Sequence, residues 1–239
     1  MENKWPKMQF KWPDNKRIAI MMSFVLDAET LWYQRSTIDD YRDHITNISR
    51  GTYGPQTGVP RILNMLDTHG IKATFYVPGW CAEQHPETIK EMIRRGHEIG
   101  AHGYEHEEGG GRSLEEEEEI INKGKAALLR TVGVTPLGHR GPGGVVYEYS
   151  TEMFLKAGFI YSSNYRDSDG PFFHRVNGKD VPLVEFPKDS LYDDGFYMCT
   201  FCDPLRQSMK SPLEAIDMMK DEFDGLAEEG GRMMTFVFH

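Results

Sequence analysis

IAIMMSFVL, residues Ile18–Leu26, is an almost unbroken run of apolar residues near the start of the chain. A continuous apolar run of this length is typical of a β-strand that is buried on both faces. The acidic segment Asp27-Ala28-Glu29 follows it directly. In parallel α/β sheets the active site lies at the carboxyl ends of the strands, so these two carboxylates are candidate functional groups. A helix N-cap is the structural alternative for Asp27.

Strand and helix patterns alternate outward from this run. β-branched and aromatic residues predict further strands at 72–77, 98–101, 137–140, 159–162, 181–186 and 233–239. Apolar residues at helical spacing, often bounded by Pro or Gly, predict helices at 60–68, 86–95, 113–131, 147–156 and 212–229. This order predicts an α/β fold in which helices cover a parallel sheet, with long loops at 163–180 and 187–210.

The composition is that of an ordinary soluble domain. Of the 239 residues, 39% are hydrophobic and 27% charged, and we expect a single domain over 1–239. The net charge of −10 disfavours nucleic acid and anionic membranes as partners, because both are negatively charged. We see no secretory leader and no membrane span, and the three cysteines, Cys81, Cys199 and Cys202, are too few for a disulfide framework. These features predict a cytoplasmic protein with free thiols.

The most distinctive local motif is HGYEH, with imidazoles at His102 and His106. Two histidines four residues apart can converge on one metal ion, and with Asp27 they would form a set of ligands typical of zinc and iron enzymes. Taken alone the motif is weak, because two loop histidines explain it equally well. The other histidines lack a motif partner and are expected on the surface or in loops.

A second motif, Arg140-Gly141-Pro142-Gly143, follows another predicted strand. The proline fixes the turn, and the glycines allow backbone N–H groups to approach a ligand and to stabilise a developing oxyanion. An ordinary turn is the alternative. His239 ends the last predicted strand and therefore falls at the same edge of the sheet.

Taken together, these motifs resemble the polysaccharide deacetylase superfamily, carbohydrate esterase family 4 with its NodB-homology domain. The segments that carry the resemblance are 24–29, 96–106, 140–144 and 235–239. Five further segments are similar to a branch with Helicobacter-type peptidoglycan deacetylase, cyclic imide hydrolases and allantoinase-like enzymes; they are 49–54, 58–63, 73–79, 184–187 and 193–194.

The resemblance implies a distorted (β/α) barrel with fewer than eight parallel strands and hydrolysis of a non-peptide C–N bond. It implies a divalent metal, most plausibly zinc, held by Asp27, His102 and His106. The metal would polarise an amide carbonyl and activate water. The backbone N–H of Gly143 corresponds to the oxyanion donor, and His239 to the general acid that protonates the leaving nitrogen.

The chain departs from the family pattern at the general base. The usual first strand ends F-D-x-D, but Val25 stands in place of the first Asp, whose usual partner corresponds to Arg140. Residues 25 and 27 share a strand face, so Val25 should point where Asp27 points. Glu29 resembles an acid of the allantoinase-like branch, some of whose members work without the usual metal; because that branch has Asn where this chain has Asp27, metal binding is still expected. Gly143 also replaces an expected aromatic residue.

The resemblance also sets an expectation about length, because the family normally continues for roughly 50 residues beyond the histidine that corresponds to His239. We therefore expect the domain to be C-terminally incomplete, and a barrel without its last element would leave an open edge that favours homo-oligomers.

Three functions are compatible with these residues. The first is a metal-dependent hydrolase of an N-acylated sugar or small amide, with Glu29 or a metal-activated hydroxide replacing the missing base. The second is a ring-opening hydrolase of cyclic imides or ureides, and the third is a non-catalytic binding module. Trp32, Tyr53 and Trp80 fall near predicted strand ends or loops and are candidate substrate-binding residues, with core packing as the alternative.

Overall fold

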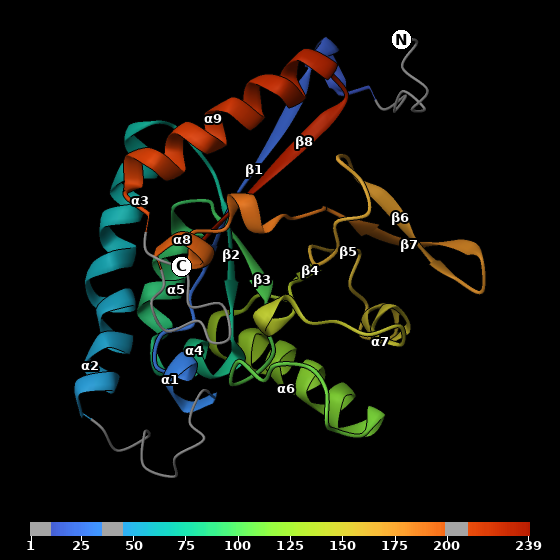
Figure 1. Ribbon diagram of the computed structural model, residues 1–239. Coiled ribbons are helices and arrows are strands. Elements are labelled where there is room, and N and C mark those ends of the chain that lie inside the picture. The colour runs from blue at the N-terminus through green and yellow to red at the C-terminus, as the bar shows by residue number, and fades with distance from the viewer. Residues whose placement is uncertain (1–10, 35–44, 199–209) are drawn as a thin grey trace.

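A computed structural model describes residues 11–34, 45–198 and 210–239, which are built around one curved sheet (Figure 1). The strands in spatial order are β6-β7-β5-β4-β3-β2-β1-β8. Their bounds are β1 Ile18–Val25, β2 Thr74–Val77, β3 Glu98–Ala101, β4 Gly138–His139, β5 Tyr161–Ser162, β6 Phe172–Val176, β7 Lys179–Glu185 and β8 Arg232–Phe238. All neighbouring pairs are parallel except β6 and β7, which form an antiparallel hairpin at one edge.

Helices cover the outer face of the sheet, and α9 lies alongside β8 in Figure 1. The longest, α6 and α9, each begin with a capping box, at Ser113 with Glu116 and at Ser211 with Glu214. The α-helices are α1 Thr30–Gln34, α2 Ile45–Tyr53, α3 Val59–Thr68, α4 Gly79–Gln84, α5 Pro86–Arg94, α6 Leu114–Val132, α7 Ser150–Lys156, α8 Gly195–Met198 and α9 Pro212–Glu229. Shorter helical turns are η1 Pro13–Asn15, η3 Gly54–Gly58, η4 Pro142–Gly144 and η5 Ser190–Tyr192.

The predicted barrel-like sheet with fewer than eight parallel strands is confirmed. Within the described ranges seven strands run parallel, β6 runs antiparallel, and the sheet does not close. The prediction of a long loop at 163–180 is wrong, because β6 and the start of β7 lie there. The sequence does carry the signal for this hairpin: Asn177 and Gly178, with φ of 51° and 76°, form a turn that requires residues tolerant of positive φ. The predicted loop at 187–210 contains η5 and α8 in its described part, whereas Cys199 and Cys202 lie outside the described residues.

Alternation along β1 determines which residues reach the interior of the curved sheet. Phe24 and Leu26 belong to the apolar core that packs against the outer helices. Ser23 points to the other side, where its hydroxyl accepts a hydrogen bond of 2.8 Å from Arg140 Nη1. Since alternate residues of a strand share a face, Val25 lies on the interior face together with Ser23.

The segment that follows β7 pairs with the edge strand β8 near its carboxyl end. After β7 the chain returns to β8, where Asp193 forms a parallel bridge with Val237. The backbone N–H of Asp194 donates to the Val237 carbonyl at 3.0 Å. This contact brings the segment after β7 beside the end of β8, so that both contribute side chains to one rim.

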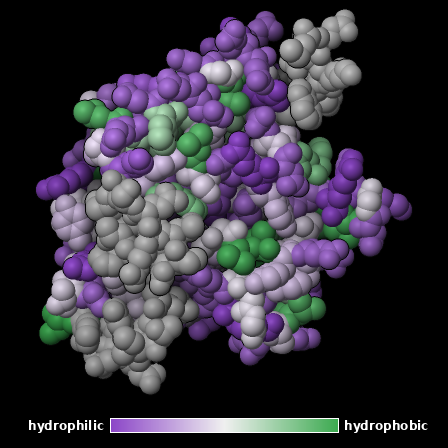
Figure 2. Space-filling model, in the orientation of Figure 1, coloured by the Kyte–Doolittle hydropathy of each residue, from purple (hydrophilic) through white to green (hydrophobic). Residues whose placement is uncertain are grey.

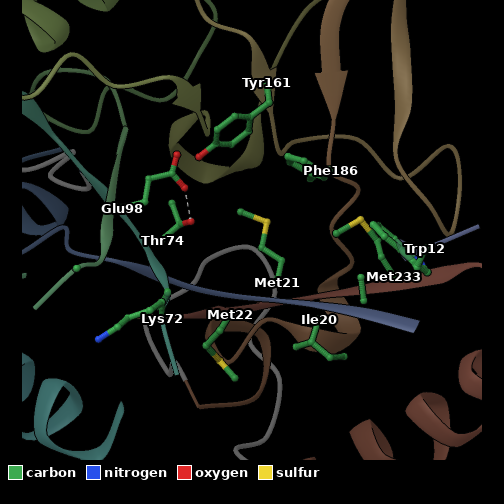
Figure 3. Close-up of a pocket in the computed structure, with 13 residues that line it drawn as sticks. Trp12, Ile20, Met21, Met22, Lys72, Thr74, Glu98, Tyr161, Phe186 and Met233 are labelled. Carbon is green, nitrogen blue, oxygen red and sulfur yellow. Dashed lines mark hydrogen bonds between the residues drawn. The ribbon is translucent and has the colours of Figure 1, made fainter. Parts of the chain in front are cut away.

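A hollow of about 420 Å³ opens at the opposite end, where the strands begin (Figure 3). In this hollow Thr74 donates a hydrogen bond of 2.7 Å to Glu98, and the Met21 side chain points into the hollow (Figure 3). The hollow contains none of the predicted site residues. Its lining residues come from the first positions of β1, β2, β3 and β8 and from neighbouring segments, and include Trp12, Ile20, Met21, Thr74, Glu98, Tyr161, Phe186 and Met233.

The surface in Figure 2 is mostly hydrophilic, with apolar residues in small separate groups. None of the helices in the described ranges is both long enough and apolar enough to cross a bilayer.

Two glycines in the longest helices test how α6 packs against the loop after β3, which contains Gly103. A Cβ on Gly124 in α6 would lie 2.2 Å from the Gly103 carbonyl oxygen, whereas a Cβ on Gly225 in α9 would meet nothing within 4 Å. We expect Gly124→Ala to destabilise the protein by about 1–3 kcal/mol through overpacking, despite the higher helix propensity of alanine. Gly225→Ala, the matched control, should stabilise it by about 0.5–1 kcal/mol. Urea denaturation measures both changes, and a Gly124→Ala protein as stable as the wild type would contradict the close contact.

Candidate active site

Asp27, His102 and His106 converge at the carboxyl ends of β1 and β3. The Nε2 atoms of His102 and His106 lie 3.5 and 3.6 Å from Asp27 Oδ1. One ligand atom from each residue can be chosen so that all three lie within 4.8 Å of one another, and all three residues are buried. The structure therefore brings together the three residues that the sequence resemblance assigned to a metal.

The local backbone orients the two imidazoles. His102 Nδ1 lies 2.7 Å from the Arg140 carbonyl oxygen, a position in which it donates a hydrogen bond and leaves the Nε2 lone pair for a ligand. Gly103 and His106 both have positive φ, 69° and 62°, so the chain turns tightly enough to place the two rings with centroids 5.1 Å apart. Such a backbone is strained at His106 and is typical of a functional constraint.

The chemistry of these side chains fits a divalent cation. Asp27 Oδ1 is buried and has no hydrogen-bond partner among the described residues, which is costly for a carboxylate oxygen. Burial, together with the neighbouring His106, lowers the pKa of His102 well below its usual value, so its imidazole is neutral and able to coordinate. One carboxylate and two imidazoles match the donor set of catalytic zinc sites.

Arg140 is fully buried inside the curved sheet, and its partners are neutral. Its guanidinium donates to the hydroxyls of Ser23 and Ser163, each at 2.8 Å, and lies over the ring of Tyr76 with 4.1 Å from Cζ to the centroid. No carboxylate oxygen of the described residues lies within 4.0 Å of it. The first Asp of the F-D-x-D pattern would be the carboxylate partner of Arg140, but position 25 is valine. Arg140 instead bonds the hydroxyl of Ser23, which lies two residues earlier on the same strand face.

A buried polar cluster around Glu185 holds the turn that contacts Arg140. The Glu185 carboxylate accepts hydrogen bonds from the backbone N–H groups of Asn164 and Tyr165 and contacts His174 Nε2 at 2.8 Å. The Asn164 side-chain oxygen in turn accepts a bond of 2.7 Å from the Gly141 N–H. This cluster therefore fixes the segment that leads into η4.

Gly143 lies in η4 with φ of 62°, and Gly144 follows with φ of 70°. A Cβ on Gly143 would lie 3.1 Å from Cδ of Glu108, so no larger residue fits there without displacing that side chain. The positive φ and the nearby Glu108 side chain both favour glycine at position 143.

His239 pairs with two acidic residues after β7. Its Nδ1 lies 2.7 Å from Asp194 Oδ1 and 3.6 Å from Asp193 Oδ1. The His239 side chain is 41% exposed, but partial desolvation by its neighbours favours the neutral imidazole. The hydrogen bond to Asp194 and the negative charges of Asp193 and Asp27 outweigh this effect and raise the pKa of His239 to about 9. Asp193, Asp194 and His239 are close enough to one another for a second cation, although their polar atoms already bond each other and backbone N–H groups.

Of the remaining predicted site residues, Glu29 lies in the turn before α1, and Trp32, Tyr53 and Trp80 lie in α1, α2 and α4. Glu29 is buried, and its carboxylate contacts His85 Nε2 at 2.9 Å. This contact lies outside the set of Asp27, His102 and His106, which we call the Asp27 group. Trp80 packs edge-on against Tyr33 and Trp32 lies under the Arg50 guanidinium, so both are half-buried. Tyr53 is 54% exposed and accepts a hydrogen bond from Arg61.

Sequence reasoning assigned no role to Ser163, Asn164, Lys188 or the Asp193–Asp194 pair, all of which lie at this rim. The feature of the sequence that could have identified them is their position, because each follows the carboxyl end of β5 or β7. The expectation that the other histidines lie on the surface or in loops is wrong for two of them: His139 and His174 are buried within β4 and β6, and His174 belongs to the Glu185 cluster. His97 is also buried, but it lies in the loop before β3.

Comparison with known proteins identifies the family. Residues 52–162 match the family model described as polysaccharide deacetylase. A crystal structure of a putative polysaccharide deacetylase from Mycobacterium smegmatis is 33% identical, with a TM-score of 0.87, over 96% of this chain and 79% of that one. The chain belongs to the polysaccharide deacetylase family. The Helicobacter pylori peptidoglycan deacetylase is 27% identical over 237 residues, which cover 90% of this chain and 80% of that protein. The crystal structure of Puue allantoinase, 22% identical with a TM-score of 0.80, has the same fold.

We expect the Asp27 group to bind one zinc ion per chain. His102→Ala removes a ligand and should abolish both stoichiometric zinc binding and the rise in melting temperature that zinc causes. The control is His69→Ala, because His69 is exposed at the end of α3 and should leave zinc binding unchanged. Elemental analysis after dialysis and thermal melting with added zinc provide the measurements. Retention of one zinc ion by His102→Ala would show that the site lies elsewhere.

Proposed function

We propose that this polysaccharide deacetylase family member is a metal-dependent hydrolase that removes an acyl group from the nitrogen of a sugar or a small amide. The named relatives are deacetylases, hydrolases of non-peptide C–N bonds. The observation that carries the proposal is the convergence of Asp27, His102 and His106, with the Gly143 segment and His239 at the same rim.

Binding and activation of the acyl group follow from these residues. Asp27, His102 and His106 would hold the divalent cation, which when bound supplies Lewis acidity that polarises a carbonyl and acidifies water. The N–H of Gly143 would stabilise the negative charge that develops on the carbonyl oxygen. The glycine requirement at 143 and the hydrogen bonds that fix Gly141 support this role, because an oxyanion donor must be held in place before the reaction.

His239 would deliver the proton to the leaving nitrogen. Its Nδ1 is occupied by Asp194, so Nε2 is the atom from which a proton can be donated. Because the pKa of His239 is about 9, the imidazole carries that proton at neutral pH.

Proton abstraction from water is assigned to Glu29, because position 25 offers no carboxylate. The contact with His85 fixes the position of the Glu29 side chain. Glu29→Gln should therefore lower turnover by about a hundredfold while zinc binding is retained.

Ring-opening hydrolysis of a cyclic imide or ureide is the second candidate. The neutral surroundings of Arg140 favour it, because Ser23 and Val25 on one face of β1 leave the deacetylase base position without an acid. Assays of the zinc-loaded enzyme on an N-acetylated sugar and on a cyclic imide distinguish the two reactions. Zinc binding without turnover of either would instead indicate a binding module.

Restoring the acid at position 25 tests the assignment of the base. Val25→Asp should raise acetate release from N-acetylated sugars by about tenfold or more, because a general base contributes about 10²–10⁴ in rate. Arg140 nearby would keep the new carboxylate ionised. Val25→Asn is the matched control, with nearly the same shape and no charge.

Thermal melting of the same variants separates this effect from destabilisation. If Val25 serves only as a packed core residue, the buried carboxylate would lower the melting temperature strongly without any gain in acetate release. That pattern would refute the base-replacement idea.

The pH profile tests the general acid. A group with a raised pKa keeps its proton up to that value, so activity should fall as the pH rises through about 9. Asp194→Asn removes the carboxylate that raises the pKa of His239 and should move this alkaline limb to lower pH by about one unit or more. Asp217→Asn, an exposed acid in α9, is the control. An alkaline limb that Asp194→Asn does not move would exclude His239 as the acid.

A further inference from the structure

Lys188 is a largely buried cation at the site rim to which the proposed reaction assigns no role. It follows β7 by three residues, and its backbone N–H donates to the Tyr165 carbonyl at 3.1 Å, next to the turn that holds Arg140 and Gly141. Its side chain is only 13% exposed. A Cβ on Gly144 would lie 3.1 Å from Nζ of Lys188, so the ammonium lies against the backbone directly after Gly143.

The ammonium has more donors than partners. An ammonium group offers three N–H donors, and the nearest carboxylate oxygen in the described residues is Asp193 Oδ2 at 3.7 Å, beyond ordinary hydrogen-bond length. The other oxygen of Asp193 accepts from the Gly195 N–H, and Asp194 is taken by His239. Within the described residues, Lys188 therefore has one distant carboxylate neighbour, Asp193, and none at ordinary hydrogen-bond length.

A largely buried ammonium without a close acceptor destabilises the folded protein unless a ligand supplies acceptor atoms. Burial lowers the pKa of Lys188, and the Arg140 charge acts in the same direction, whereas Asp193 opposes both. A purely structural cation would be better served by a tight ion pair or by an apolar side chain. The carboxylate on the other flank of the glycine segment, Glu108, is exposed, so water screens it far more than it screens Lys188.

We propose that Lys188 is a substrate-binding residue whose ammonium holds a carboxylate of the substrate, so that preferred substrates carry an acidic group close to the amide that is hydrolysed. The carboxylate supplies the acceptor oxygens that the ammonium lacks. Its position beside Gly144 places that acidic group next to the carbonyl held at Gly143. This inference rests on the proposed function for the identity of the reacting amide, but the anion-binding property of Lys188 can be measured without turnover.

Binding of succinate and of its monomethyl ester, which differ by one carboxylate, provides the direct test. Calorimetry on the zinc-loaded wild type should show about tenfold tighter binding of succinate, the size expected for one charge-assisted hydrogen bond. Lys188→Met should abolish this preference while melting temperature and zinc content are retained, and Lys188→Arg should keep part of it. Lys90→Met, an exposed lysine of α5 paired with Glu87, is the control and should bind as the wild type does.

The kinetic arm uses two N-acetylated compounds that differ by one carboxylate near the amide. For the acidic one, Lys188→Met should raise KM about tenfold with little change in kcat, and the neutral one should be unaffected. Equal binding of both probes by the wild type, or an unchanged preference in Lys188→Met, would overturn the inference. A fall in kcat for both compounds without a change in probe binding would also overturn it, because the ammonium would then act on the oxyanion. If the probe preference holds but no amide is hydrolysed, the proposed function fails and the Lys188 site stands.

Discussion

The burial of Arg140 is the constraint on which the rest of this structure depends. Its guanidinium fills the interior of the curved sheet between the hydroxyls of Ser23 and Ser163, over the ring of Tyr76, and its own carbonyl orients His102. One residue thus joins β1, β2, the end of β5 and the loop that carries His102. Burying a cation among neutral groups is expensive, so each of its hydrogen bonds must be kept. The Glu185 cluster meets this demand by fixing the turn at Ser163 and Asn164.

The parallel arrangement of the strands brings these residues together at one site. Each strand of the parallel set ends at the same rim, so residues far apart in sequence, such as Asp27, His102 and His239, meet there. The return of the chain from β7 to β8 adds the Asp193–Asp194 pair to that rim. The rim therefore contains the Asp27 group, the glycine segment at 143–144 and a histidine with raised pKa, to which we assign the parts that a C–N hydrolase requires. The hollow at the opposite end of the strands contributes none of them (Figure 3).

Much of this arrangement follows from the sequence, for physical reasons. The apolar run at 18–26 and the Pro and Gly boundaries of the helices predict the parallel core, because burial on both faces leaves a clear pattern. The Asp27, His102 and His106 group is predictable because the resemblance ties the three positions together. Strand β6, and with it the hairpin that it forms with the predicted strand β7, escaped prediction because β6 is short and mixed in polarity, although Asn177-Gly178 marks the turn. The contact of Glu29 with His85 and the position of Lys188 beside Gly144 depend on how helices and loops pack, which no local pattern encodes.

The central claim is that Asp27, His102 and His106 hold the catalytic metal. Anomalous diffraction at the zinc absorption edge, on crystals grown with zinc, tests it most directly. The account predicts one strong anomalous peak between Asp27 Oδ1 and the Nε2 atoms of His102 and His106. A zinc peak at Asp193, Asp194 and His239 instead, or none at the Asp27 group, would contradict it.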